Sequence, residues 1–313
     1  MAICRISLLL CIGLWLTCLT GCAGLKKWEL LQKEGKLPPR FELKMVPFFP
    51  QKAYQCGPAS LAMSLNWSGL PVSPEDLTDE VFTPTRKGSL QTALISAARR
   101  HGRIAYISTG IETIFSEVAA GHPVIILQNL GLSWYPVWHY SVVVGYDLPK
   151  KFVILRSGAT ARKIMPSRVF VNTWARSNYW GLLILRPDQL PATAEKGQFL
   201  EAVLGLEKAR QFRAAIHGYK TALARWPQNL TALMGIGNCH YAQGELKDAE
   251  SAFRKAVRLH PKEGSALNNL AQILFEQGRK QEALETIKKA VSLGGPLSAV
   301  YEKTLEEIQA GSR

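Results

Sequence analysis

Long apolar runs and acidic residues are scarce in this 313-residue sequence, and its six cysteines do not form a CxxC pair. Only one apolar run, at the N-terminus, is long enough to raise the question of a membrane, which excludes a multispanning membrane protein. No CxxC, HExxH or phosphate-loop motif occurs, so the sequence supports neither a metal site nor a nucleotide site, and we expect no cofactor. What is present, 47% apolar and 20% charged residues, is the composition of a folded chain, and the length favours two domains.

The scarcity of acidic residues leaves a strong positive charge. Lysine and arginine number 38 against 24 aspartate and glutamate residues, which gives a formal net charge of +14. Such an excess favours anionic partners. Because the N-terminus indicates export, we expect anionic lipid, cell-wall carboxylates or an acidic peptide as the partner, and not nucleic acid.

The N-terminal apolar run covers residues 6–20, fewer than the roughly 20 residues needed to span a bilayer. A basic residue before it and small residues behind it are typical of a secretory signal. The run ends in Leu-Thr-Gly-Cys22, which resembles the lipobox of bacterial lipoproteins. The resemblance implies that residues 1–21 are a signal peptide and that Cys22 carries the lipid that anchors the protein to the membrane. Because Ala23 follows, it also implies sorting to the outer membrane of the cell envelope, facing the periplasm. An ordinary signal peptide with an incidental cysteine is the alternative.

Signal cleavage would leave Cys56 and Cys239 as the free thiols, so no disulfide framework is expected. Residues 22–43 are polar and basic and are predicted to form a tether between the lipid and the first domain. Its first eighteen residues after the lipidated cysteine would reach about 60 Å when fully extended.

Residues 44–190 mix helical and strand patterns. The helical segments come first and the strand-rich sequence follows, which favours an α+β domain over alternating βαβ units. The expected helices are 56–67, 89–101 and 112–120, and the expected strands are 104–108, 124–127, 140–146, 152–155 and 180–185.

Residues 191–313 repeat with a period of 34. Alanine recurs at Ala215, Ala249 and Ala283, and five further positions keep the same register. This pattern resembles three tetratricopeptide repeats, which implies an all-α solenoid closed by a capping helix over residues 297–310. Cys239 falls in the first helix of the middle repeat, where we interpret it as a buried apolar residue.

The segment Gln55-Cys56-Gly57-Pro58-Ala59 carries the most specific chemistry. A cysteine at the start of an amphipathic helix lies where the helix dipole stabilises a thiolate. Gly57 would let a substrate backbone approach, and a glutamine just upstream could donate to an oxyanion. The alternative is an inert structural cysteine.

A thiol nucleophile needs a base, and His139 is the best candidate among six histidines. It alone opens a long predicted strand, His-Tyr-Ser-Val-Val-Val-Gly-Tyr-Asp, which ends at Asp147. Together, the cysteine and histidine segments resemble the papain-like double-glycine leader peptidases, which process bacteriocin precursors. The resemblance covers residues 44–187 and implies a papain-like fold with Cys56 as the nucleophile, His139 as the base and Gln51 in the oxyanion hole.

Two positions depart from that family's pattern. Gln51 lies five residues before the cysteine, where the family glutamine lies six before it. The family's third catalytic residue is an aspartate on the strand after the histidine strand, but the matching segment here contains no carboxylate. A hairpin turning at Leu148-Pro149 would place His139 opposite Gly158, which leaves Ser157 as the doubtful third member.

We therefore expect an envelope-anchored cysteine peptidase, weakened or specialised, that cleaves a peptide or protein substrate recruited by the repeats. Asn238 and Asn269 are candidate peptide ligands on the concave face of the repeats, although ordinary surface amides are the alternative. A catalytically silent papain-like scaffold that binds peptides is the second hypothesis, and acyl transfer by the same thiol is the third.

Overall fold

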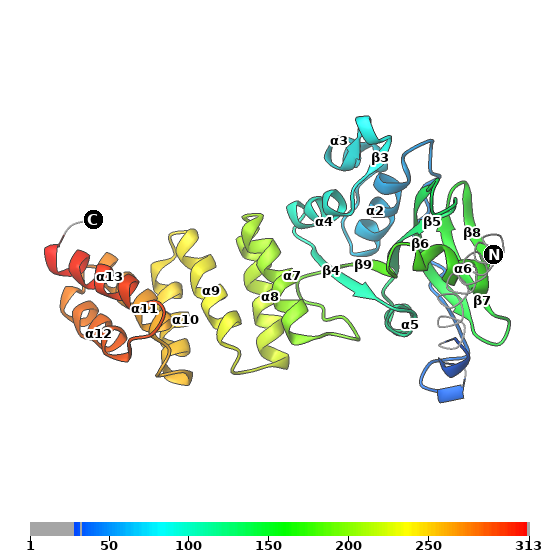
Figure 1. Cartoon of the computed structure of the whole chain (residues 1–313). Coiled ribbons are helices and arrows are strands. Elements are labelled where there is room, and N and C mark those ends of the chain that lie inside the picture. The colour runs from blue at the N-terminus through cyan, green and yellow to red at the C-terminus, as the bar shows by residue number, and fades with distance from the viewer. Residues whose placement is uncertain (1–27, 32, 312–313) are drawn as a thin grey trace, which may run out of the picture. The chain divides into compact units, whose positions relative to one another are not determined.

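The computed structural model describes residues 28–31 and 33–311 (Figure 1). The chain up to Arg186, together with Pro191–Ala194, forms one unit, which we call the sheet unit. Pro187–Leu190 and the chain from Glu195 onward form the other, the repeat unit. The predicted signal peptide and the predicted lipidation site at Cys22 lie outside the described residues. In the part that is described, no helix has both the length and the apolarity that a membrane crossing requires.

A seven-stranded antiparallel sheet forms the centre of the sheet unit, with the strand order β4-β9-β5-β6-β7-β8. The long strand β6 is buried from Tyr140 onward because it has neighbours on both sides. β1 pairs with the end of β6, beyond the point at which β5 stops. The strands are β1 (Arg40–Glu42), β4 (Ile104–Thr109), β5 (Val124–Asn129), β6 (Trp138–Asp147), β7 (Phe152–Ser157), β8 (Thr160–Pro166) and β9 (Trp180–Leu185).

Helices pack against this sheet, and α2 contacts its centre at β5, β6 and β9. Every residue of α2 from Gly57 to Leu65 is buried, so the helix is not amphipathic as the sequence suggested; it is apolar on all sides because it is surrounded by protein. The other elements are α3 (Pro74–Val81), α4 (Gln91–Arg100), α5 (Ile111–Ala119), α6 (Ser167–Ala175) and a small hairpin of β2 (Phe82–Thr83), the 3₁₀ turn η1 (Pro84–Arg86) and β3 (Gly88–Ser89), with α2 itself at Cys56–Trp67.

The predicted α+β class is confirmed, and α2 and β9 have the predicted bounds. The sequence analysis missed β1, β8, α3, α6 and the small hairpin of β2, η1 and β3. β8 shows why, because its residues are mostly exposed and polar and give no period-two apolar signal. The positions of these missed elements depend on pairing and packing with segments that are distant in the sequence.

The predicted tether is wrong over its C-terminal part, since this segment packs onto the sheet unit. Trp28 is 1% exposed, donates from Nε1 to the carbonyl of Leu148 at 3.3 Å, and meets the ring of Phe115 edge to face. Residues 40–42 extend the sheet as β1. Burial of an aromatic side chain of this size, together with the strand pairing of β1, favours the packed position of this segment.

The helices of the repeat unit keep the 34-residue period in their bounds. The first helices of successive repeats begin at residues 196, 230, 264 and 298, and the second helices begin at 212, 246 and 280. The helices are α7 (Lys196–Lys208), α8 (Phe212–Arg225), α9 (Leu230–Ala242), α10 (Leu246–Leu259), α11 (Gly264–Glu276), α12 (Lys280–Leu293) and α13 (Ser298–Ala310). The predicted all-helical repeat region is therefore confirmed, and α13 occupies the predicted capping position.

The repeat packs through small residues that face large ones. Ala215, Ala249 and Ala283 are fully buried, as the 34-residue pattern required. A side chain at Gly237 would overlap the ring of Phe253, whose atoms come within 2.4 Å of the position of a Cβ. Only glycine therefore lets this aromatic residue pack between repeats.

Candidate active site

Cys56 is the first residue of α2, so backbone N–H groups of the first helical turn surround its thiol. Gln55 precedes it without a side-chain cap, and helix starts leave such donors unpaired. Gly57 serves a different purpose from the one expected: a Cβ there would lie 2.3 Å from Ser89 Oγ. Because Gly57 has no side chain, β3 can pack against the helix. The glycine therefore positions the cavity wall and not a substrate backbone.

Burial dominates the electrostatics of this thiol. Desolvation raises the pKa of Cys56 above its usual value, and backbone hydrogen bonds from Tyr140, Gly57 and Cys56 itself only partly offset the rise. The helix start therefore favours the thiolate, as the sequence analysis argued, but burial has the larger effect. The thiol is protonated at neutral pH.

His139 lies near the start of β6, beside the cysteine, and is also largely buried. Burial, with the nearby charge of Lys163 as a smaller cause, lowers the pKa of His139 to about 4. Its imidazole is therefore neutral at pH 7, and the resting pair is a thiol with a neutral imidazole. The expectation of a preformed thiolate is corrected accordingly.

The ring of His139 is held by a hydroxyl where the related peptidases are expected to use a carboxylate. Nε2 of His139 lies 2.9 Å from Oγ of Ser157, which is 2% exposed. Nδ1 is then the ring atom available to the thiol. Asp147 lies at the far end of the same strand, where its Oδ1 accepts from the N–H of Lys150, so it takes no part in the site.

The register between β6 and β7 differs from the predicted one. The strands pair Val142 with Arg156, and a bulge between Val143 and Gly145 shifts the remaining pairs. The uniform hairpin assumed from the sequence placed His139 opposite Gly158. The observed pairing of Val142 with Arg156, continued along both strands, would instead place His139 opposite Ala159. Ser157 nevertheless reaches the imidazole, because it lies diagonally across from it.

Ser157 continues into a buried polar chain that the sequence analysis missed. Gln128 Nε2 donates to Thr173 Oγ1 at 2.8 Å, and Thr173 Oγ1 donates to the carbonyl of Val169 at 2.8 Å. Thr173 must therefore accept from the amide, which orients the amide oxygen of Gln128 toward Ser141 at 3.4 Å. Gln128 is fully buried, so its amide oxygen needs a hydrogen-bond donor.

This polar chain engages one ring nitrogen of the histidine. Ser141 Oγ donates to Gln128 Oε1 or to Ser157 Oγ, which lies 3.1 Å away, and Ser157 Oγ lies 2.9 Å from Nε2 of His139. Because Ser157 pairs with Nε2, Nδ1 is the ring nitrogen that remains for the cavity.

Gln51 enters the same cavity, whereas Gln55 turns away from it. Gln51 Oε1 accepts from the N–H of Gly158 at 2.8 Å, and its Nε2 donates to Ser60 Oγ and to the carbonyl of Tyr140, both at 3.2 Å. Gln55 Oε1 instead accepts from Thr78. Both N–H groups of the Gln51 amide are thus donated to protein acceptors beside the thiol, at the long end of the hydrogen-bond range.

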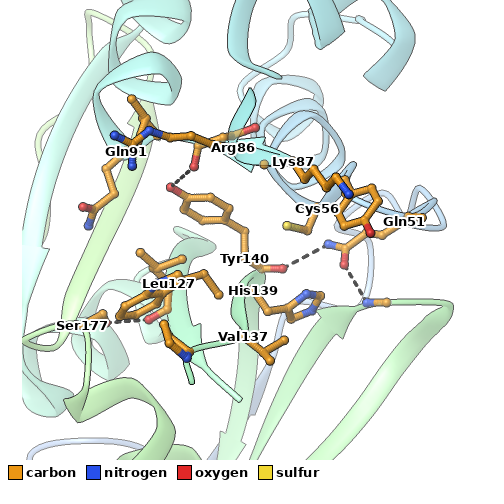
Figure 2. A pocket seen from close by; sticks show the side chains of 18 of the residues that line it. Gln51, Cys56, Arg86, Lys87, Gln91, Leu127, Val137, His139, Tyr140 and Ser177 are labelled. Atoms are coloured by element: carbon orange, nitrogen blue, oxygen red, sulfur yellow. Dashed lines mark hydrogen bonds between the residues drawn. The ribbon is translucent and has the colours of Figure 1, made fainter. Parts of the chain in front are cut away.

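A cavity of about 880 Å³ brings the three predicted residues together, and Figure 2 shows the side chains of Gln51, Cys56 and His139 directed into it. Ser157 lies behind the histidine and does not line the cavity. The site therefore brings together a thiol, an imidazole and an amide, the groups that nucleophilic attack on a carbonyl requires.

The candidate residues Asn238 and Asn269 belong to the repeat unit. Nδ2 of Asn269 donates to Oδ1 of Asn238 at 3.3 Å, so the structure brings these two residues together across neighbouring repeats. Cys239 is fully buried, and burial raises its pKa to about 12, with the charge of Glu207 as a smaller cause.

A single group of metal-ligating side chains occurs among the described residues. His240, Glu245 and Asp248 place ligand atoms within 4.8 Å of one another on the repeats. Both carboxylates are exposed, and three ligands are fewer than the four of a structural zinc site. We assign no metal to it.

The α+β fold of the sheet unit thus holds partly buried cysteine, histidine and glutamine side chains around one cavity. Residues 43–181 match the Peptidase_C39 like family, and residues 200–263 and 240–297 match the tetratricopeptide repeat. The chain thus carries a C39-like peptidase domain followed by tetratricopeptide repeats, which confirms both resemblances drawn from the sequence.

Solved structures similar to the chain fall into the same two groups. A C39-like peptidase from Bacillus anthracis is 21% identical, covers 47% of this chain and 97% of its own, and has a TM-score of 0.40. The Yersinia enterocolitica type III secretion chaperone SycD, in complex with a peptide of YopD, is 18% identical over 36% of this chain and 92% of its own, with a TM-score of 0.34. The TPR domain of Sgt2 from Aspergillus fumigatus is 20% identical over 38% and 79%, with a TM-score of 0.35. No curated protein shows significant similarity to the chain.

Proposed function

We propose that this protein is a cysteine peptidase in which Cys56 attacks a peptide carbonyl and His139 acts as the base. The observation that carries the proposal is the buried chain from Gln128 through Ser141 and Ser157, which engages Nε2 of the imidazole and leaves Nδ1 for the thiol. A purely structural histidine would not need its ring held in this way beside a cavity that a cysteine also lines. Membership of residues 43–181 in the C39-like family supports the same assignment.

The reaction starts from two neutral groups. Nδ1 of His139 takes the thiol proton as the sulfur of Cys56 bonds to the carbonyl carbon, and Gln51 Nε2 donates to the oxygen that becomes negative. The imidazolium then gives its proton to the departing amine as the carbon–nitrogen bond breaks. Water, deprotonated by the same imidazole, hydrolyses the thioester and restores the thiol.

The hydroxyl of Ser157 orients the imidazole but stabilises the imidazolium less than a carboxylate would, because it carries no charge. Loss of an orienting carboxylate costs up to about ten-thousandfold in serine proteases. We therefore expect slow cleavage unless substrate binding supplies compensating interactions. This places the enzyme among specialised peptidases and not among general digestive ones.

The lipid anchor at Cys22, the outer-membrane address and substrate recruitment by the repeats belong to the same proposal. They are supported by the lipobox-like segment and by the repeat unit, whose Asn238 and Asn269 form a polar contact across repeats. In this scheme the repeats hold a protein substrate or partner while the sheet unit cleaves it at the envelope surface.

The decisive experiment compares purified wild type with Cys56→Ala and Cys239→Ala on a broad peptide mixture, with mass spectrometry of the products. We expect new peptide termini from wild type and from Cys239→Ala, and none from Cys56→Ala. Iodoacetamide should label Cys56 before Cys239, which is fully buried. Cleavage that survives Cys56→Ala would contradict the peptidase assignment.

The alternative of a silent peptide-binding scaffold follows from one observation, the neutral thiol and imidazole. It predicts that wild type and Cys56→Ala bind peptides equally and that neither yields products nor a thioester. Acyl transfer would instead be revealed by products that carry an added amine when an amine is supplied.

A further inference from the structure

Two unlike walls enclose the cavity on either side of Cys56 and His139. Arg86 and Lys87, from the small β2–β3 hairpin, form one wall, and Tyr135 to Trp138, from the β5–β6 loop, form the other. Figure 2 shows Arg86 and Lys87 on one side of the cysteine and Val137 on the opposite side, beyond the histidine. A substrate held across the thiol must therefore contact both.

The first wall is cationic and its charge is not neutralised locally. No aspartate or glutamate of the described chain lines the cavity. Lys52 at the rim is paired with Glu75 at 2.9 Å, but no ion pair is recorded for Arg86 or Lys87 within the residues that the structure describes. A cavity lined by charge of one sign concentrates ligands of the other sign.

Backbone strain supports a functional role for this wall. Tyr54 and Lys87 both adopt left-handed backbone conformations, with φ of 64° and 46°. Non-glycine residues pay for such conformations, and these outliers gather at binding sites. The two side chains meet, since Nζ of Lys87 lies 5.9 Å from the centre of the Tyr54 ring. The ammonium group of Lys87 thus lies over the Tyr54 ring, and both residues line the cavity.

The second wall is apolar and exposed. Tyr135 is 70% exposed, and Val137 and Trp138 are each 49% exposed. Singly exposed apolar residues need no explanation, but a contiguous group beside a cavity indicates a binding surface. This group continues directly into the cavity that contains the thiol, so its occupant is the molecule that enters that cavity.

The loop that carries these side chains is preorganised. Oδ1 of the buried Asn129 accepts from the N–H groups of Gly131 and Val137, both at 2.9 Å. Arg176 donates to the carbonyls of Asn129 and Gly131. A Cβ at Gly131 would lie 2.4 Å from the carbonyl oxygen of Tyr135, so the tight loop requires glycine there. A rigid apolar surface loses little entropy when it binds.

We propose that the cavity selects peptides that carry acidic side chains on one side of the scissile bond and aromatic or aliphatic side chains on the other. This inference rests on the proposed function and names its substrate class. The acidic part lies against Arg86 and Lys87, and the apolar part lies against Tyr135 to Trp138. The wall contacts provide the binding energy that a site without an orienting carboxylate needs.

The test measures binding, so that it is independent of turnover. Full-length Cys56→Ala is titrated with fluorescently labelled short peptides that carry a glutamate block and a phenylalanine-leucine block, in both orders. Matched peptides replace glutamate with glutamine, or the apolar block with serine. One order should bind best; its glutamine version should bind about fivefold more weakly at low salt, as two exposed ion pairs would give, and its serine version about tenfold more weakly.

Salt separates the two walls. Raising the ionic strength should remove the difference between the glutamate and glutamine peptides, because exposed charges are screened, and should leave the apolar difference intact. The double variant Arg86→Glu/Lys87→Glu should reverse the preference in favour of a peptide with lysine in place of glutamate. Tyr135→Ser should weaken binding of the apolar peptides only.

Matched controls are available away from the cavity. Lys150→Glu changes an exposed lysine that does not line it, and Met45→Ser changes a side chain that is 83% exposed and does not line it. Equal binding of the glutamate and glutamine peptides at low salt, or an equal effect of Lys150→Glu and the double variant, would overturn the inference. Cleavage by wild type without any such preference would overturn the inference but keep the peptidase; selective binding without cleavage would overturn the peptidase and keep the preference.

Discussion

The two units each place one cysteine in a helix, and burial raises the pKa of both thiols. Cys239 is fully buried in the repeats, does not line the cavity, and has the carboxylate of Glu207 close enough to raise its pKa further. Cys56 has a neutral imidazole, an amide and helix N–H groups beside it, and a cavity in front of it. Burial alone therefore does not determine whether a cysteine can act as a nucleophile. A base and an accessible cavity beside the thiol are also required.

The units also differ in how they distribute polarity. The repeat unit buries alanine and aromatic residues in a fixed register, with isolated buried polar side chains such as Thr304. The sheet unit buries a connected polar chain from Gln128 to His139 under α6. A change in the apolar core of the repeat unit should affect stability first, and a change in the polar chain of the sheet unit should affect activity first. Four predictions test this contrast, the largest first.

Removal of the base should have the largest effect. His139→Gln should lower kcat/KM for a cleaved peptide by at least about a thousandfold, because general base catalysis and the thiol's only nearby proton acceptor are lost together. His217→Gln, at an exposed position of the repeats, should leave kcat/KM unchanged. Comparable rates for wild type and His139→Gln would show that the sheet unit does not act through this residue.

Truncation of a core side chain in the repeat unit should lower stability without abolishing peptide cleavage. Phe253 is 2% exposed, and Phe253→Ala should lower the unfolding free energy of the repeat unit by about 3–5 kcal/mol. Cleavage of a short peptide should persist. The matched change Phe170→Ala, at a fully buried position of the sheet unit, should reduce both stability and cleavage. Urea unfolding followed alongside peptide hydrolysis would measure this, and loss of short-peptide cleavage in Phe253→Ala would break the contrast.

The buried polar chain should affect kcat more than KM. Gln128→Leu removes the acceptor beside Ser141, so the chain that holds the imidazole is weakened, and kcat should fall between about tenfold and a hundredfold, less than the loss of a carboxylate costs. Gln128→Glu keeps an acceptor at that position and should retain most of the activity. Equal losses in the two variants would indicate a packing role only.

The lowered pKa of His139 should make the sheet unit less stable in mild acid. The unfolded chain binds a proton near pH 6.5, whereas the folded chain does so only near pH 4. The contribution is therefore complete above pH 6.5 and is lost as the pH falls toward 4. Between pH 7 and pH 5 the loss should be about 2 kcal/mol, and His139→Gln should not show it. Urea titrations at both pH values, with NMR titration of the imidazole, provide the check.

The two units were also unequally predictable from sequence. The helix bounds of the repeats follow from local periodicity, so residues such as Ala249 could be assigned to the core without any tertiary information. Cys56 and His139 could be found because their motifs are local. Gln128 and Ser141 could not, because their roles depend on the bulge in β6 and on α6, which contribute through distant contacts. Trp28 was missed for the same reason.

The packing of Trp28 against Phe115 and Leu148 has a consequence for reach. If lipid is attached at Cys22, five residues lie between the anchor and Trp28, and the six Cα–Cα steps from Cys22 to Trp28 span at most about 20 Å. The distance to the bilayer would be a third of what the full tether allowed. The sheet unit would then stay close to the lipid headgroups, and its substrates would be those that come to the membrane surface.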